Sequence, residues 1–308
     1  MGSAPVASGV YVTLDGGYAY SDGSSTIGHA ISPTGALADP SAETLIQADD
    51  GYALSGSIGY VAPSGFAAAL PISRIEGYLS FSSTDDSNAD TVNDPQRITL
   101  KSVDGTALGV IGVMAASAQE LRRYEGGVRF AYDQSTGAAS SLSFVVTPFV
   151  RNIDEETSSV AIGTADTAWR DADVTTWAYG VTVAVEPEVW LTPEVALVGR
   201  LGAGLYGYSA NGDFSSRSTA GGGGFDPFAA SVSDDESGIG FRGELGAGLK
   251  FKLTEAVTLT GYGEATYFSA VGSASLPDNQ FVTATTSSVD ISDSWELRAG
   301  VRLSIGLQ

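Results

Sequence analysis

His29 is the only histidine of the chain and the residue type best suited to acid–base chemistry near neutral pH. It lies in a Gly- and Ser-rich stretch, and Asp22 is the nearest acid in the sequence. A histidine–carboxylate pair can activate water or a hydroxyl group for hydrolysis. Nothing else in the sequence marks a nucleophile or an activated water. We therefore interpret His29 as a surface histidine without a catalytic role.

Two stretches resemble calcium-binding loops without completing the pattern. Residues 86–90 supply acids at the first and fifth positions of an EF-hand loop. The sixth position, which requires glycine, is Thr91, and the twelfth, which requires glutamate, is Arg97. Residues 221–226 resemble one copy of a repeat-type calcium turn, but a single copy is by default a flexible loop. Neither stretch predicts a metal site.

Residues 202–207 match the glycine fingerprint of dinucleotide-binding proteins. That fingerprint binds pyrophosphate only where a helix follows it, and here the surrounding residues alternate as in a strand. We interpret the glycines as providing room in a crowded lumen or barrel wall, and no cofactor is predicted.

The last segment, residues 295–307, shows the pattern that explains the rest of the chain. Its odd positions are all apolar, and its even positions are charged, small or polar. Successive side chains of a strand point to opposite faces, so one face is hydrocarbon for about 13 residues, whereas a tilted membrane-spanning strand needs about 9–11. The pattern is typical of a transmembrane β-barrel.

Nine further segments alternate in the same way, and short turns and long polar connections separate them in strict alternation. The predicted strands cover 9–20, 52–61, 74–81, 119–132, 142–151, 175–185, 195–208, 239–251, 257–268 and 295–307. This organisation predicts one domain, 1–308, with residues 1–8 as an N-terminal extension. The fold class is all-β: a single antiparallel up-and-down transmembrane barrel of about ten strands, with long acidic extracellular loops and short periplasmic turns.

The connection 83–118 leaves the strand count open. Its apolar, glycine-rich part can form a hairpin extension above the membrane, a segment folded into the lumen, or two further strands. If residues 97–114 supply a strand pair, the barrel has twelve strands. A soluble sandwich is the competing interpretation, but it would need a second layer over the apolar face, and no segment is left to provide one.

The predicted strand faces place most basic residues inside the barrel. The inward basic residues are Arg74, Arg123, Arg129, Arg151, Arg200, Arg242, Lys250, Arg298 and Arg302. The inward acids are Asp15, Glu76, Glu125, Glu186, Glu244, Glu264 and Glu296. Buried charges are costly unless paired, so this near balance predicts an ion-paired lumen.

Two specific contacts follow from the expected register. Arg242 is predicted to neutralise both Glu244 and Glu264. Asp15 on the first strand is predicted to lie near Arg302 once the last strand closes the barrel.

The remaining charges are 29 acids and six bases, and they lie mostly in the long connections. They include Asp85, Asp86, Asp90, Asp94, Asp154, Glu155, Glu156, Asp213, Asp234, Asp235 and Glu236. Solvation and mutual repulsion explain such acids, and weak divalent-cation binding by their oxygens is the alternative. A net charge of −21 argues against nucleic acid as a partner.

Composition adds two points about the compartment. The chain has no cysteine, so it has no disulfide framework and no thiolate metal site. No secretory hydrophobic region follows Met1, so export would imply a signal peptide that has been removed.

Segments 237–249 and 259–268, with the alternation described above, resemble strands of Gram-negative outer-membrane β-barrels. The resemblance covers the whole chain as a pattern and includes porin-like and OmpA-like barrels. It implies location in the outer membrane, contact with its lipid and lipopolysaccharide, assembly by the barrel assembly machinery, and compatibility with a homo-oligomer. The class typically ends in an aromatic residue, whereas this chain ends in Leu307 and Gln308.

We expect a non-catalytic structural or surface protein whose lumen is narrow or closed. Eight strands are just filled by their side chains, and open channels belong to 16–18 strands. A narrow porin-like diffusion channel is the alternative. A second alternative comes from the resemblance of ten-stranded barrels to the omptin proteases, which rely on Asp pairs and a His–Asp pair, and to the lipid A deacylases, which rely on Ser and His.

Overall fold

The computed structural model describes residues 9–22, 27–32, 43–62, 72–105, 107–137, 139–164, 166–219, 227–277 and 286–307. These residues form strands and short turns. The strands are β1 (Gly9–Ser21), β2 (Ile27–Ser32), β3 (Glu43–Ile46), β4 (Asp50–Val61), β5 (Arg74–Lys101), β6 (Ala107–Gly137), β7 (Ser140–Gly163), β8 (Thr167–Trp190), β9 (Val195–Ser218), β10 (Phe228–Lys252), β11 (Val257–Ser275) and β12 (Ser288–Leu307). Within the described part of the chain, no helix is long and apolar enough to cross a membrane.

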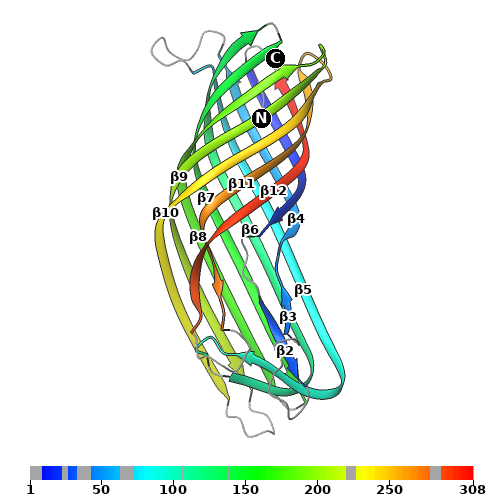
Figure 1. Ribbon diagram of the computed structural model, residues 1–308, viewed down its shortest axis with the longest axis vertical. Coiled ribbons are helices and arrows are strands. Elements are labelled where there is room, and N and C mark those ends of the chain that lie inside the picture. Colours follow the sequence, from blue (N-terminus) through cyan, green and yellow to red (C-terminus); the bar gives the residue numbers. More distant parts are fainter. Residues whose placement is uncertain are drawn as a thin grey trace.

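Ten of these strands form a closed antiparallel ring (Figure 1). The order around it is β1, β4, β5, β6, β7, β8, β9, β10, β11 and β12, and β1 pairs with β12 to complete it. The short strands β2 and β3 form a hairpin that is not part of the ring. It pairs with residues 97–99, near the C-terminal end of β5. The ten-strand prediction is therefore confirmed, and the twelve-strand alternative is wrong for the ring.

The outer face of the ring is apolar over the segments predicted to span the membrane. Leu79, Ile239 and Leu205 are 74%, 81% and 64% exposed, as expected of side chains that face lipid rather than a second protein layer. Aromatic rings contact one another along the edge of this band nearer the long connections. Phe81 packs between Tyr52 and Tyr124 at centroid distances of 5.8 and 5.0 Å. Aromatic girdles of this kind mark the membrane–water interface.

Six strands, β5 to β10, continue far beyond that band. Each has 24–31 residues, about twice what a bilayer needs. Figure 1 shows the end of β12 at one end of the barrel and the β2–β3 hairpin at the other. In barrels of this class the short turns lie on the periplasmic side, so we call the end with the short turns periplasmic and the end with the extension extracellular.

The long connections are therefore mostly strand, which the sequence argument missed. Residues 152–163 belong to β7, 167–174 to β8, 209–218 to β9 and 228–238 to β10. The connection 83–118 is the first of the three alternatives, a hairpin extension: β5 and β6 pair from Arg74 to Lys101 with one irregularity. Here Ile98 and Leu100 are buried, while exposed positions such as Asp85, Ser87 and Asn88 are polar, so the lipid-facing apolar pattern ends while the strands continue.

The C-terminal part of β11 and the N-terminal part of β12 do not continue in the sheet formed by the long strands. The β11–β12 register shifts between Phe268 and Val271, and residues 270–274 are buried on both faces of the strand. A bulge bends a strand out of its sheet plane. Here it turns the β11–β12 hairpin into the interior of the extension, where Ala274 and Val289 pack against β8 and β9 residues such as Ala172 and Phe214.

Candidate functional site

The most unusual feature of the barrel is the set of ionisable side chains inside it. The fourteen residues predicted to line the lumen all take part in interior contacts: Asp15, Arg74, Glu76, Arg123, Glu125, Arg129, Arg151, Arg200, Arg242, Glu244, Glu264, Glu296, Arg298 and Arg302. Strand alternation explains this placement, since each lies on the face opposite the lipid-exposed apolar residues.

The centre of the set is a group that spans the barrel, which we call the central cluster: Arg123, Glu125, Arg151, Arg242 and Glu296. Glu125 accepts from Arg242 at 3.0 Å and from Arg151 at 3.3 Å. Glu296 pairs with Arg151 and, at 3.0 Å, with Arg123. Arg151 on β7 and Glu296 on β12 are five strands apart in either direction around the ring, so their contact crosses the full lumen.

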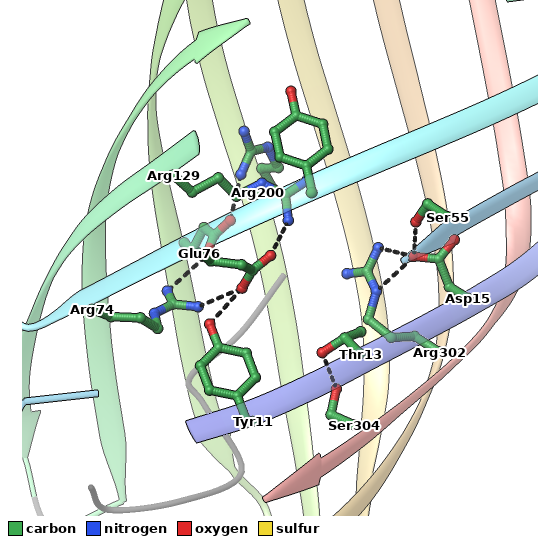
Figure 2. A network of polar contacts seen from close by, with 12 residues as sticks. Tyr11, Thr13, Asp15, Ser55, Arg74, Glu76, Arg129, Arg200, Arg302 and Ser304 are labelled. Carbon is green, nitrogen blue, oxygen red and sulfur yellow. Dashed lines mark hydrogen bonds and ion pairs between the residues drawn. The ribbon is translucent and has the colours of Figure 1, made fainter. Parts of the chain in front are cut away.

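A second group lies nearer the periplasmic turns, around Glu76 (Figure 2). Arg129 donates to Glu76 at 2.7 Å, and the Tyr11 hydroxyl donates to it at 2.5 Å. Arg74 lies 3.8 Å from Glu76 and 3.5 Å from Glu186 of β8. Arg200 pairs with Glu186 and, at 2.6 Å, with Glu244. This group therefore links β1, β5, β6, β8, β9 and β10.

A third group closes the seam between the first and last strands (Figure 2). Arg302 lies 3.1 Å from Asp15, the contact predicted from the sequence. Asp15 also accepts from the Ser55 hydroxyl at 2.6 Å and from the Tyr262 hydroxyl at 3.2 Å. The carboxylate thus has partners on three other strands.

One predicted pairing is wrong. Arg242 pairs with Glu244 at 2.9 Å, but Glu264 pairs with Arg302, at 3.6 Å. The cause is register: Glu264 lies opposite Gly246 on β10 and Arg298 on β12, whereas Arg242 lies opposite Phe268, four residues farther along.

Three interior acids were not predicted, and two of them contact predicted bases. Glu188 is 2% exposed and pairs with Lys250 at 3.0 Å. Asp133 lies 3.6 Å from Arg74. Both stand in stretches interpreted as turns, although they continue the alternation of Glu186 and Arg129, which was the available signal. With them nine acids face the nine predicted bases, and Glu155 and Arg170, both buried farther along the axis, add one charge of each sign, so the described interior is neutral rather than slightly positive.

Glu155, interpreted from the sequence as a loop acid, is also interior. It is 1% exposed, and Gln119 donates to it at 2.7 Å. It lies above the central cluster because β7 keeps alternating past Arg151.

An aromatic layer covers the central cluster on the extracellular side. The guanidinium of Arg151 lies 4.3 Å from the Phe268 ring centroid, and that of Arg242 lies 4.5 Å from the Phe149 ring. Tyr206 packs on both rings and donates to the carbonyl of Ala270 in the bulge of β11. Apolar clusters continue above this layer, with the buried Glu155 and Arg170 among them, so ionisable groups become fewer along the barrel axis.

The tip of the β5–β6 hairpin also reaches this apolar interior. Val103 is fully buried against Phe214, and its amide donates to the Ser216 hydroxyl at 3.3 Å. The extracellular half is therefore filled by two hairpins, β5–β6 from its rim and β11–β12 from within.

Little free space remains among the charges. The cavity bordered by the three groups has a volume of about 70 Å³. A water molecule needs about 10–15 Å³ on this measure, so the space suits roughly five waters.

The catalytic, cofactor and calcium motifs considered in the sequence do not come together in one site within the described residues. His29 lies on β2 opposite Thr44, and residues 202–207 lie within β9 with no helix after them. Residues 221–226 lie outside the described residues. Residues 86–90 lie on β5, and in the described part of the chain no group of three or more His, Cys, Asp or Glu side chains is arranged to hold a metal ion.

The outer wall of the extension carries a row of carboxylates on five adjacent strands. Asp85 on β5 pairs with Glu120, which pairs with Glu156, and the row continues to Asp173 and Asp213. Arg122 on β6 forms ion pairs with Glu120 at 2.6 Å and with Glu156 at 3.3 Å, whereas Asp173 and Asp213 face each other directly. Directly opposite like charges destabilise a sheet. Accordingly, burial and then the neighbouring carboxylates raise the pKa of Asp173 above its ordinary value.

Comparison with known proteins gives likeness of architecture only. No protein-family model matches the chain, and no curated protein matches it. Among solved structures, the outer-membrane protease OmpT from Escherichia coli is 7% identical, with 97% of each chain covered and a TM-score of 0.48. The outer-membrane protein OprG from Pseudomonas aeruginosa is 11% identical over 99% of this chain and 100% of that one, with a TM-score of 0.23. Ail of Yersinia pestis is 14% identical over 95% and 97% of the two chains, with a TM-score of 0.22.

Proposed function

We propose that this outer-membrane β-barrel is a non-catalytic structural and surface protein whose lumen is closed to solutes. The observation that carries the proposal is the central cluster, in which Arg151 joins Glu296 across the full width of the ring. A solute would have to separate buried ion pairs, and each separation leaves charges without partners, which costs several kcal/mol.

The extracellular half supports the same conclusion. Above the central cluster the lumen is filled by apolar clusters from β11, β12 and the tip of β5–β6, and the buried Glu155 and Arg170 among them accept and donate hydrogen bonds within the protein. A hydrated ion that entered would lose its hydration against this packed filling. A charged layer below and an apolar layer above form two successive barriers.

The interior carboxylates are also poorly arranged for catalysis. Glu125 and Glu296 each accept from two guanidinium groups. Such contacts hold a carboxylate ionised and in place, whereas a general acid or base must exchange a proton with a substrate. We propose that the network is structural: it stabilises the ring and fixes its strand number, while the outer band contacts membrane lipid and lipopolysaccharide.

Planar-bilayer conductance tests the proposal. The purified barrel, shown to be folded by its shifted mobility on an unheated detergent gel, is expected to give flat current traces at all voltages. The control is the Arg151→Ala, Arg242→Ala double variant, which removes two guanidinium groups from the centre of the lumen. Current steps from that variant would show that the assay detects a path of this size.

Regular current steps from the folded wild-type protein would overturn the proposal. They would establish the narrow diffusion channel instead, with Arg129, Arg200 and Arg298 beside the 70 Å³ cavity as the residues along its path.

A further inference from the structure

The inward turn of the β11–β12 hairpin leaves β10 without a neighbour on one side. β10 pairs with β9 along its whole described length, from Phe228 to Phe251. Its pairing with β11 runs only from Arg242 to Lys252. Above Arg242, β11 instead follows β12 into the interior. Within the described residues, the extracellular wall therefore ends at β10.

The direction of the β10 backbone groups shows which of them face this open side. The amide of Lys252 donates to the carbonyl of Glu194, on the β9 side. The amide of Phe241 donates to the Ser269 hydroxyl, on the β11 side. Amide direction alternates along a strand, and the β9–β10 register is unbroken. The amides of Ser233, Asp235, Ser237 and Ile239 therefore point away from β9.

The same stretch is exposed on both of its faces. Residues 235–239 are all exposed, whereas a covered strand alternates between buried and exposed positions. Glu236 and Gly238 occupy inward positions and are exposed because no wall stands opposite them. The edge begins at the level of Ile239, next to the lipid-facing band, and rises from there into the extracellular space.

The edge is acidic, and so is the wall beside it. Asp234, Asp235 and Glu236 are consecutive, and Asp213 on β9 lies directly opposite Ser233. Asp234 already accepts from the amide of Val289, which leaves Asp235 on the outer face and Glu236 on the inner face as the charges at the open edge. No basic residue occurs between residues 228 and 241.

We propose that residues 233–239 of β10 form a docking edge that binds an extended, lysine- or arginine-rich segment of another protein by strand addition. The main-chain groups at the edge supply backbone hydrogen bonds, and alternate side chains of the added strand meet Asp235 or Glu236. A basic segment can place positive side chains next to Asp235 on the outer face of β10 and next to Glu236 on its inner face. The proposal does not depend on whether the lumen conducts.

A second copy of the chain is a poorer occupant of the same edge. Antiparallel pairing of two β10 edges would bring the two acidic stretches together, and like charges directly opposite destabilise a sheet. Natural proteins use charged edges in this way to prevent self-association. The acids thus select against a second copy while favouring a basic strand.

Peptide binding to the intact barrel in nanodiscs tests the proposal. The probe is a fluorescent twelve-residue peptide of alternating lysine and threonine, followed by anisotropy, and the control peptide carries glutamate in place of lysine. The basic peptide is expected to bind and the acidic one not to bind. Ser237→Pro removes an outward amide without touching the β9 ladder, so it is expected to weaken binding about tenfold. Ser237→Ala keeps the amide and should change binding less than twofold.

Charge variants separate strand addition from general attraction to an acidic surface. Asp235→Asn with Glu236→Gln is expected to weaken binding roughly fivefold. Asp171→Asn with Asp173→Asn removes the same charge from β8 and should weaken peptide binding less than about twofold. Ser233→Pro replaces Ser237→Pro if the latter gives no heat-modifiable barrel. Equal binding to wild type and to the proline variant would overturn the proposal, as would the absence of binding by the basic peptide.

Discussion

At the scale of single residues, the barrel depends on charges that have no access to bulk water. Arg151, Glu125 and Glu296 are 1%, 8% and 5% exposed. An isolated charge at such a site would be strongly unfavourable, and it is tolerated here because each has more than one partner. The stability of one member therefore depends on the presence of the others.

Glu296→Gln tests this dependence. The substitution keeps the size of the side chain but leaves Arg123 and Arg151 with one carboxylate fewer, so we expect a loss of about 3–5 kcal/mol in the free energy of unfolding. Urea unfolding in lipid vesicles, followed by tryptophan fluorescence, measures it. The exposed pair Lys252–Glu255 provides the control: Lys252→Gln should cost less than about 1 kcal/mol. Similar losses from the two variants would refute a structural role for the central cluster.

Within the recognised strands, alternation determines the face of a charged residue, but not all of its partners. The structure places Arg74, Arg129 and Glu244 on the predicted inner face, whereas Asp133, Glu155 and Glu188 lie beyond the recognised strand ends and were missed. Partners across the lumen depend on the shear of the closed ring, which no local pattern records. Hence Asp15–Arg302, across the neighbouring strands β1 and β12, was predictable, while the Arg151–Glu296 contact across the ring was not.

At the scale of strands, ring closure requires two backbones to approach closely at a pair of glycines. Gly17 on β1 lies opposite Gly300 on β12. A Cβ atom on Gly17 would lie 2.2 Å from the carbonyl oxygen of Ala299, and one on Gly300 would lie 2.5 Å from that of Gly16. Both contacts are with backbone, which cannot move without separating the strands.

Gly17→Ala is therefore expected to weaken the seam between the first and last strands. We expect a lower fraction of heat-modifiable protein after refolding and a loss of about 1–3 kcal/mol in stability, the usual cost of overpacking. Gly263→Ala is the matched control, because nothing lies within 4 Å of a Cβ atom there. If both alanine variants refold like wild type, the close approach at the seam has no energetic consequence.

Strand ends were the weakest part of the sequence prediction. The ten segments were identified because each shows lipid-facing alternation, and this signal stops at the membrane interface. Past it, β7 carries Asp154 and Glu156 on its outer face, which resembles a polar loop in composition. The bulge after Phe268 left no recognisable signal, because Ser269 and Ala270 are ordinary strand residues.

At the scale of the whole molecule, charge is divided between a neutral interior and an acidic exterior. The chain has a net charge of −21, and since the lumen is balanced, that charge lies outside it. The row from Asp85 to Asp213 concentrates part of it on one wall of the extension, where each carboxylate faces another across a strand pair. Arg122 pairs with Glu120 and Glu156, so the like-charge repulsion remains at the β8 end of the row, around Asp173. That part of the wall is expected to be more stable in mildly acidic than in neutral solution.

Asp173→Asn tests this expectation. The pKa of Asp173 is raised in the folded state, so its ionised form opposes folding, and this opposition is lost as the pH falls through the folded-state pKa towards the ordinary value of about 3.9. At pH 7 the variant should be more stable by about 0.5 kcal/mol, the scale of one like-charge cross-strand pair, seen as slower amide hydrogen exchange in the upper parts of β7, β8 and β9. The difference in stability should shrink below about pH 4 and in about 0.5 M salt, where screening is stronger.

Asp293→Asn, at an exposed acid on β12 outside the row, should leave exchange in those strands unchanged. Faster exchange in Asp173→Asn at pH 7 would mean that the carboxylates of the row stabilise the wall, for instance by sharing a cation.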